Sequence, residues 1–160
     1  MKKSFFVVIV FIFALGAFVY YNNLPKTNKP DNAGRVVATN KKAVLYKSPN
    51  CGCCVGYAKA LRQNGFEVEI ISVNDISSIK NKYGIPTDKQ SCHTVVIGDY
   101  FVEGHVPMEA VNKLVKENPD IDGIGLPRMP TGTPGMPGPK RGPFNIYQLN
   151  NGEFSQFMVL

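Results

Sequence analysis

The sequence predicts an α/β domain in which a mixed sheet is flanked by helices. Short runs of β-branched and apolar residues alternate with stretches of helical periodicity between residues 42 and 116. Apolar residues make up 44% of the 160 residues and charged residues 19%, which is typical of a globular chain rather than a disordered one. Once the N-terminal targeting segment is set aside, the remaining length suits one domain of ordinary size.

The N-terminus has the composition of a targeting segment. Lys2 and Lys3 precede the apolar run Phe5–Tyr21, which is near the lower limit of about 17–25 residues for a membrane-spanning helix. We expect residues 1–22 to be a signal peptide or a hydrophobic transmembrane anchor, and the bulky residues after Ala17 favour the anchor. Residues 23–41 are polar and predict a flexible tether. The lysines predict that the domain 42–160 faces the periplasm, anchored in the inner membrane through residues 5–21 or secreted after cleavage.

The first part of the domain predicts two strands, each followed by a helix. In chain order these are the strand Lys42–Tyr46, the helix Val55–Gln63, the strand Phe66–Ile71 and a short helix capped by Asp75 and ended by Gly84. Asn64-Gly65 is a strong stop signal for the first helix. The residues expected to point inward from the two helices are Ala58, Leu61, Ile76, Ile79 and Tyr83.

The next part predicts a hairpin and a third helix. The strand Cys92–Ile97 turns at Gly98-Asp99 into Tyr100–Gly104, and Pro107 opens a helix that runs to Lys116. The complete order is therefore βαβα, a hairpin and a helix. This order predicts a thioredoxin-like domain, with helices on both faces of the mixed sheet.

The C-terminal part begins with a segment rich in Gly and Pro. Residues 120–143 show no periodicity and predict a long loop. Two alternating runs, Phe144–Leu149 and Glu153–Val159, flank Asn150-Asn151-Gly152, which is a strong hairpin signal. The Gly/Pro-rich loop is therefore expected to leave the fold and rejoin it through a C-terminal β-hairpin.

Four cysteines are the residues most suited to chemistry. Cys51, Cys53 and Cys54 fall between the first strand and the first helix, and Cys92 opens a later strand. A helix N-terminus stabilises thiolates, which lowers their pKa and makes them good nucleophiles and good ligands. Lys47 and Lys59 are expected to add to this effect.

Three interpretations of the cysteines stay open. Cys51 and Cys54 form a Cys-X-X-Cys pair, which fits a thiol–disulfide oxidoreductase. The third thiol, Cys53, is not needed for such exchange and favours a soft-metal site completed by Cys92, with Cu(I) the first choice and zinc the rival. The third interpretation is structural: one disulfide from Cys51 to Cys53 or Cys54, and a second from the remaining thiol to Cys92.

Histidines and methionines are further candidate ligands. His93 follows Cys92, and because neighbours in a regular strand point to opposite faces, only one of the two is expected to face the cluster; we favour Cys92. His105 is as well suited to a structural hydrogen bond as to metal ligation. Met129 and Met136 lie in the Gly/Pro-rich loop, where a thioether can reach a metal ion or pack against the core.

The charge distribution argues against nucleic-acid binding. The net charge is +6, but basic residues are scattered among acids, and no basic stripe interleaved with aromatic residues occurs. The expected partners are instead a metal ion and, in a copper pathway, a membrane copper transporter or another periplasmic copper protein.

Several motifs together resemble the domain-of-unknown-function family 411. They are Ser48-Pro49-Asn50-Cys51-Gly52-Cys53-Cys54, Leu61-Arg62-Gln63-Asn64-Gly65-Phe66-Glu67-Val68, Ser91-Cys92-His93-Thr94, Glu103-Gly104-His105-Val106-Pro107 and Met129-Pro130-Thr131-Gly132-Thr133-Pro134-Gly135-Met136. The resemblance covers roughly residues 42–160. It implies a periplasmic, copper-associated metal-binding protein with a thioredoxin-like fold.

The resemblance also implies roles for individual residues. It points to Cys51, Cys53, Cys54 and Cys92 as the functional thiols. The two histidines and the loop methionines are further candidates. The family often has Trp shortly after the cysteine cluster, whereas this chain contains no Trp and has Tyr57 there.

Overall fold

The computed structural model describes residues 41–160. The expected signal or anchor at 1–22 and all of the tether except its last residue lie outside the described residues. Within residues 41–160, no helix is long and apolar enough to cross a membrane.

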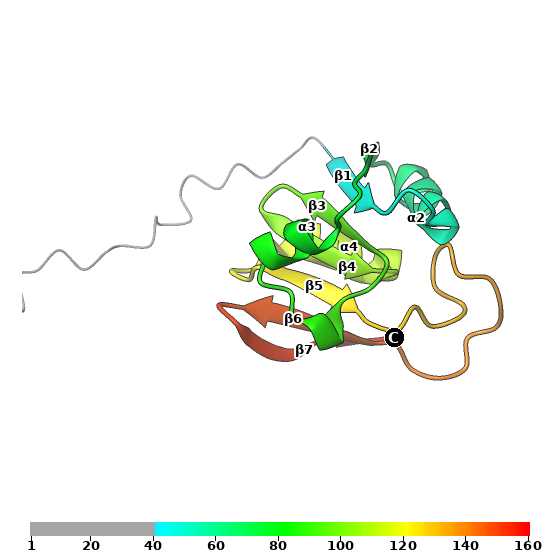
Figure 1. Cartoon of the computed structure of the whole chain (residues 1–160). Helices are drawn as coiled ribbons and strands as arrows, with labels where there is room; N and C mark the ends of the chain where they lie inside the picture. The colour runs from blue at the N-terminus through cyan, green and yellow to red at the C-terminus, as the bar shows by residue number, and fades with distance from the viewer. Residues whose placement is uncertain (1–40) are drawn as a thin grey trace, which may run out of the picture. The chain divides into compact units, whose positions relative to one another are not determined.

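Residues 41–160 form a mixed α/β fold around one sheet. The elements in chain order are β1 (Lys42–Lys47), α2 (Gly52–Gln63), β2 (Glu67–Ser72), α3 (Ser77–Lys82), a 3-10 turn (Thr87–Lys89), β3 (His93–Ile97), β4 (Tyr100–Gly104), α4 (Met108–Glu117), β5 (Gly123–Leu126), β6 (Asn145–Asn150) and β7 (Glu153–Val159). The sheet of these residues has seven strands in the order β2-β1-β3-β4-β5-β6-β7 (Figure 1). The predicted α/β class with a mixed sheet is confirmed.

Strand directions follow from the connections. β1 and β2 are parallel, because α2 carries the chain back between them, and β4 and β5 are parallel across α4. β3 is antiparallel to β4, as the tight Gly98-Asp99 turn requires, and it is also antiparallel to β1. The C-terminal hairpin β6–β7 joins the sheet through antiparallel pairing of β6 with β5.

Apolar residues cover both faces of the sheet. The larger cluster contains buried residues of α2, α4 and the inner strands, among them Leu61, Leu114 and Val102. A smaller cluster on the other face contains Ile85, Phe101 and Leu149. Phe101 and Val102 are neighbours in β4, so their side chains point to opposite faces and separate the two clusters.

The C-terminal hairpin has the predicted turn chemistry. Asn151 and Gly152 adopt positive φ values of 50° and 85°. A two-residue turn of the kind that matches the right-handed twist of strands needs this backbone conformation at both positions. The predicted hairpin is therefore confirmed, and its strands end where Phe144 and Leu160 exchange backbone hydrogen bonds.

The predicted loop over 120–143 is wrong at its start, where β5 forms. Because two of its four residues are glycines, the β5 segment shows no alternation of apolar and polar side chains in the sequence, and the strand was not predicted. A Cβ at Gly123 would lie 2.3 Å from the Phe101 carbonyl oxygen, and one at Gly125 would lie 2.3 Å from the Tyr147 hydroxyl. Neighbouring groups fill the space that side chains would take: a Cβ at Gly123 would clash with backbone, and one at Gly125 would require the Tyr147 ring to move.

The predicted inner face of the short helix α3 is wrong in one respect. Ile76, Ile79 and Tyr83 are only half-buried, whereas Lys80 is 1% exposed. A lysine is almost never fully buried unless its charge is paired. Its partner, Glu103, lies next to the candidate site described below.

Candidate metal centre

The first turn of α2 carries three of the four cysteines. Cys51 is the N-cap residue, and its backbone N–H donates to the Ser48 carbonyl. The Lys47 ammonium donates to the carbonyls of Ser48 and Pro49, so this lysine holds the loop in place beneath the cysteines. Lys59, the other expected cation, is exposed.

The four sulfur atoms converge at the N-terminal end of α2. Cys51 and Cys54 are joined in a disulfide, and Cys53 and Cys92 are free thiols. The Cys53 sulfur lies 3.5 Å from that of Cys51, and the Cys92 sulfur lies 3.7 Å from those of Cys53 and Cys54. All four sulfurs lie within 4.8 Å of one another, which is a compact donor set for a metal ion.

Only one of the two disulfides expected in the structural interpretation is formed among residues 41–160. The first bridge is present as Cys51–Cys54. The second bridge, from the remaining thiol to Cys92, is not formed, because the Cys53 and Cys92 sulfurs stay 3.7 Å apart as free thiols. The cysteines therefore do not form a two-disulfide staple, and two thiols are available beside the bonded pair.

Cys92 reaches the cluster from the opposite side of the site. Burial raises the pKa of its thiol to about 12, and the adjacent Cys53 adds to this effect. The thiol is therefore neutral without metal, and ligation of a metal ion would release its proton.

Both histidines of the sequence lie against the Cys92 sulfur. Nδ1 of His93 is 3.3 Å from it and Nε2 of His105 is 3.4 Å from it. With Cys92 they form a second group whose donor atoms lie within 4.8 Å of one another. Strand alternation does not separate Cys92 from His93, because β3 begins at His93 and Cys92 precedes it.

The environment keeps both imidazoles neutral. Burial lowers the pKa of His93 well below its usual range, and the nearby His105 and Lys80 lower it further. Burial also lowers the pKa of His105. Neutral imidazole is the form that ligates metals, so protons do not compete with a metal ion here near neutral pH.

Tyr57 is the aromatic residue of the site. Its side chain is fully buried, and its ring centroid lies 4.7 Å from that of His93 and 5.4 Å from that of His105. Its hydroxyl donates to the Val106 carbonyl at 2.8 Å. Tyr57, three residues after Cys54, therefore packs against both histidines.

A buried polar network behind the site was not predicted from the sequence. Glu103 accepts hydrogen bonds from the Lys80 ammonium and the Ser91 backbone N–H, each at 2.5 Å, and from the Thr94 hydroxyl at 2.6 Å. Burial raises the pKa of Glu103, an effect that Lys80 and the other donors oppose. The available signal was an acid inside the apolar strand Tyr100–Gly104, opposite Thr94 in β3.

The two candidate methionines lie half-buried in the loop 127–143. Met129 adopts a positive φ of 44°. Met136 directly follows Gly135, whose backbone packs against the first turns of α2. The segment that bears Met136 therefore passes the cysteine turn, and ligation by either thioether stays a prediction.

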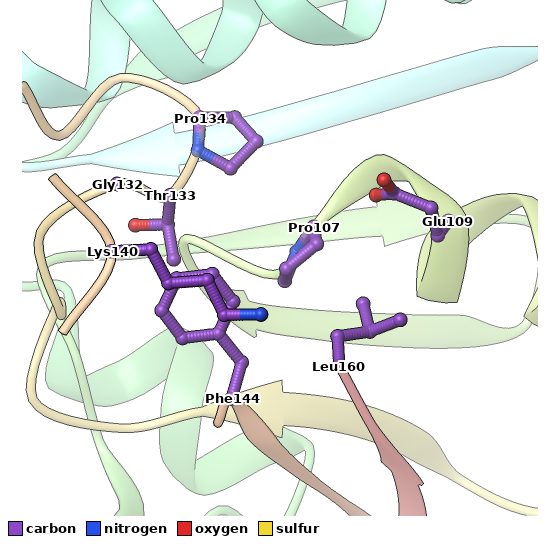
Figure 2. A pocket seen from close by; sticks show the side chains of 8 residues that line it. All are labelled: Pro107, Glu109, Gly132, Thr133, Pro134, Lys140, Phe144 and Leu160. Carbon is purple, nitrogen blue, oxygen red and sulfur yellow. The ribbon is translucent and has the colours of Figure 1, made fainter. Parts of the chain in front are cut away.

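A cavity of about 430 Å³ lies beside the centre rather than in it. It is lined by Pro107, Glu109, Gly132, Thr133, Pro134, Lys140, Phe144 and Leu160 (Figure 2). None of these residues is a candidate ligand. The cavity lies between the loop 127–143, the start of α4 and the two residues that flank the C-terminal hairpin, Phe144 and Leu160.

The comparisons with known proteins agree with the motifs. Residues 89–136 match the model of a family described as protein of unknown function, DUF411. Two solved structures, both named copper resistance protein CopG (forms 1 and 2), are similar with a TM-score of 0.69 and 37% sequence identity. The similarity covers 74% of this chain and 97% of form 2, or 96% of form 1. No curated protein matches. The chain belongs to the DUF411 family.

Proposed function

We propose that this protein binds and handles copper as Cu(I) through its four cysteines, in copper homeostasis or resistance. The observation that carries the proposal is the convergence of four sulfurs within 4.8 Å, with two buried imidazoles against the Cys92 sulfur. Thiolate and imidazole donors suit Cu(I), and zinc is the metal that competes for the same ligands. The copper resistance proteins that share its structure support the choice of copper.

Binding by all four cysteines requires reduction of the Cys51–Cys54 disulfide. A bonded pair offers no thiolate, so the oxidised site retains only Cys53 and Cys92 as sulfur donors. Reduction restores all four within one compact shell. The metal-binding capacity of this centre is therefore expected to depend on its redox state.

Titration with Cu(I) in the presence of a competing chelator, without oxygen, tests the proposal. The reduced protein is expected to bind Cu(I) with a dissociation constant well below micromolar, and Cys53→Ser is expected to weaken this binding. Val55→Ser is the matched control, since Val55 is 52% exposed on the same helical turn and offers no ligand. Affinity weaker than micromolar, or equal affinity in Cys53→Ser, would overturn the proposal, and a parallel Zn²⁺ titration decides which metal is preferred.

A second function, thiol–disulfide exchange, is favoured by the Cys51–Cys54 disulfide itself. The strand order β2-β1-β3-β4, with β1 parallel to β2 and β3 antiparallel to β1 and β4, supports the proposal of a thioredoxin-like frame. In this function, turnover of a disulfide substrate should disappear in Cys51→Ser and persist in Val55→Ser. No turnover by the native protein would exclude it.

We also propose that the protein acts at the outer face of the inner membrane, held by residues 5–21. The support is the apolar run behind Lys2 and Lys3. The full chain is expected in the membrane fraction and a chain that begins at residue 41 in the soluble fraction. Recovery of the full chain in the soluble fraction would contradict the anchor. Transfer of Cu(I) to a membrane copper transporter or another periplasmic copper protein is the exchange that this location would serve.

A further inference from the structure

We infer that residues 130–136, here called the strap, position the ligand His105 by fixing which of its ring nitrogens faces the cysteines. The inference rests on the proposed metal-binding function and adds a positioning role for backbone atoms and glycines outside the donor set. The two points that carry it are a hydrogen bond from His105 to the strap and a backbone contact between the strap and α2.

The hydrogen bond joins Nδ1 of His105 to the Pro134 carbonyl oxygen at 2.7 Å. A carbonyl oxygen only accepts, so Nδ1 must carry the hydrogen. In a neutral imidazole the other nitrogen, Nε2, then has a free lone pair. Nε2 is the atom that lies 3.4 Å from the Cys92 sulfur, so the strap directs the lone pair of His105 toward the candidate metal centre.

His93 provides a contrast within the same site. Its Nδ1 lies 3.3 Å from the Cys92 sulfur, but its Nε2 is a buried side-chain atom without a hydrogen-bond partner among residues 41–160. The backbone of Gly104 also interacts with the His93 ring, where it opposes the lowering of the pKa by burial. His105 is the imidazole whose hydrogen bond comes from the strap, through the Pro134 carbonyl oxygen at 2.7 Å.

The strap is held at this place by two facing glycines. A Cβ built on Gly135 would lie 2.7 Å from the Tyr57 nitrogen and 2.8 Å from the Cys53 oxygen. A Cβ on Gly56 would lie 2.9 Å from the Gly135 Cα. Contacts this short do not occur between real Cβ atoms and backbone, so both glycines are required for the strap to pack on the helical turn that carries Cys53.

The strap has its own local structure and borders open space. The Met136 N–H donates to the Thr133 carbonyl and the Gly132 N–H to the Met136 carbonyl, at 2.9 and 3.0 Å. Gly132, Thr133 and Pro134 also line the cavity described above (Figure 2). A strap pushed away from α2 can therefore shift as a unit without first unpacking the core.

One element thus touches both halves of the donor set. Gly135 packs on the turn that bears Cys53, and Pro134, the preceding residue, orients the imidazole that reaches Cys92. Groups that orient metal-ligating histidines typically change metal affinity by roughly 10- to 100-fold when they are removed. Displacing the strap should therefore alter His105 and leave all four cysteines and both imidazoles in the chain, and the tautomer readout reports on His105 whether or not the Met136 thioether also moves.

The substitution Gly56→Ala tests this inference, with Gly52→Ala as the matched control. Both glycines lie in α2, and a Cβ on Gly52 meets nothing within 4 Å. Alanine favours a helix over glycine by about 1 kcal/mol, so neither variant should fail to fold for lack of helix propensity. Only Gly56→Ala places a new methyl group against the strap.

The readout is the tautomer of His105 in the reduced, metal-free full-length protein, measured by ¹⁵N NMR of the imidazole nitrogens. The native protein and Gly52→Ala should show the Nδ1–H form. Gly56→Ala should lose its predominance, and its Cu(I) affinity should fall by roughly tenfold or more. Gly135→Ala should act in the same way, compared with Gly142→Ala, which has a positive φ but open space.

Three results would overturn the inference. They are a native Nε2–H tautomer, an unchanged tautomer in both Gly56→Ala and Gly135→Ala, or a changed tautomer with unchanged Cu(I) affinity. Each is compatible with Cu(I) binding by the cysteines, which the Cys53→Ser titration tests separately. The failure of the strap inference is therefore distinguishable from failure of the proposed function.

Discussion

Among single residues, the buried acid Glu103 links the metal centre to the rest of the fold. Its carboxylate binds the backbone N–H of Ser91, the residue before Cys92, and Gly104 connects it directly to His105. Its charge is paired with Lys80, and both side chains are at most 2% exposed. Removing one member of a buried ion pair costs far more than removing both, because the remaining charge stays buried and unpaired.

The substitution Glu103→Gln should therefore destabilise the protein by about 3–5 kcal/mol, because it leaves the Lys80 ammonium opposite an uncharged amide. The double variant Lys80→Met with Glu103→Gln should recover most of this loss, since the amide oxygen can still accept from Ser91 N–H. Urea denaturation of the three proteins measures the difference. A double variant as unstable as the single one would show that the charge pairing is not the cause.

The stability of the folded protein should depend on pH through His93. The lowered pKa of His93 means that the folded protein holds this group neutral, whereas in the unfolded chain it binds a proton below about pH 6.5. Its contribution to stability is thus present above that pH and is lost as the pH falls, at up to about 1.4 kcal/mol per pH unit for each proton. Denaturation of the reduced, metal-free protein between pH 8 and 5 should show this decline.

His93→Phe is the matched variant for the pH dependence. Phenylalanine retains an aromatic ring beside Tyr57 and cannot bind a proton. The slope of the free energy of unfolding against pH, below about pH 6.5, should decrease by the contribution of up to one bound proton. The slope that remains is due to groups such as His105. An unchanged slope would mean that His93 is not the residue that titrates.

Helices and strands with a regular apolar pattern were predicted correctly from the sequence. A strand rich in glycine was missed, and so was the inner face of a helix whose buried residue is charged. The helix Val55–Gln63 and the C-terminal hairpin had clear periodicity and clear stop signals, and both are present. β5 was missed because Gly123 and Gly125 leave it no alternating side chains. The inward face of α3 was misjudged because its buried residue is Lys80, whose partner Glu103 is 23 residues away.

β5 gives a prediction at this scale. In Gly125→Ala the new Cβ would lie 2.3 Å from the Tyr147 hydroxyl, so the ring must move, at a cost of about 1–3 kcal/mol. In a Tyr147→Ala background the same substitution should cost much less, because the obstacle is gone. A double-mutant cycle by chemical denaturation measures this coupling, and additive effects would contradict the proposed contact.

At the scale of the molecule, the metal centre joins segments that are distant in sequence. α2 and its N-cap supply three cysteines, the segment before β3 supplies the fourth, the turn after β4 supplies His105, and the loop 127–143 covers the first turns of α2. A metal ion bound to all of these would therefore hold the elements together. Ligand that binds only the folded state stabilises it by mass action.

Cu(I) should accordingly raise the stability of the reduced protein by about 2.7 kcal/mol at a free concentration 100 times its dissociation constant. The oxidised protein, with Cys51 and Cys54 bonded, should gain less, because only two sulfur donors remain. Thermal denaturation of both forms, with and without Cu(I), measures the two gains. Equal gains would show that Cys51 and Cys54 do not contribute to binding.

Local periodicity and residue type were enough to predict the α/β class, the motifs of the DUF411 family and the identity of the candidate thiols. Tertiary structure alone decided which atoms meet. Cys92 and His93 share one side because β3 begins one residue later than expected, Lys80 is buried because Glu103 pairs with it, and Pro134 orients His105 because two glycines let the strap approach α2. The Lys80–Glu103, His105–Pro134 and Gly56–Gly135 contacts join residues 23, 29 and 79 positions apart, and no local pattern encodes contacts across such separations.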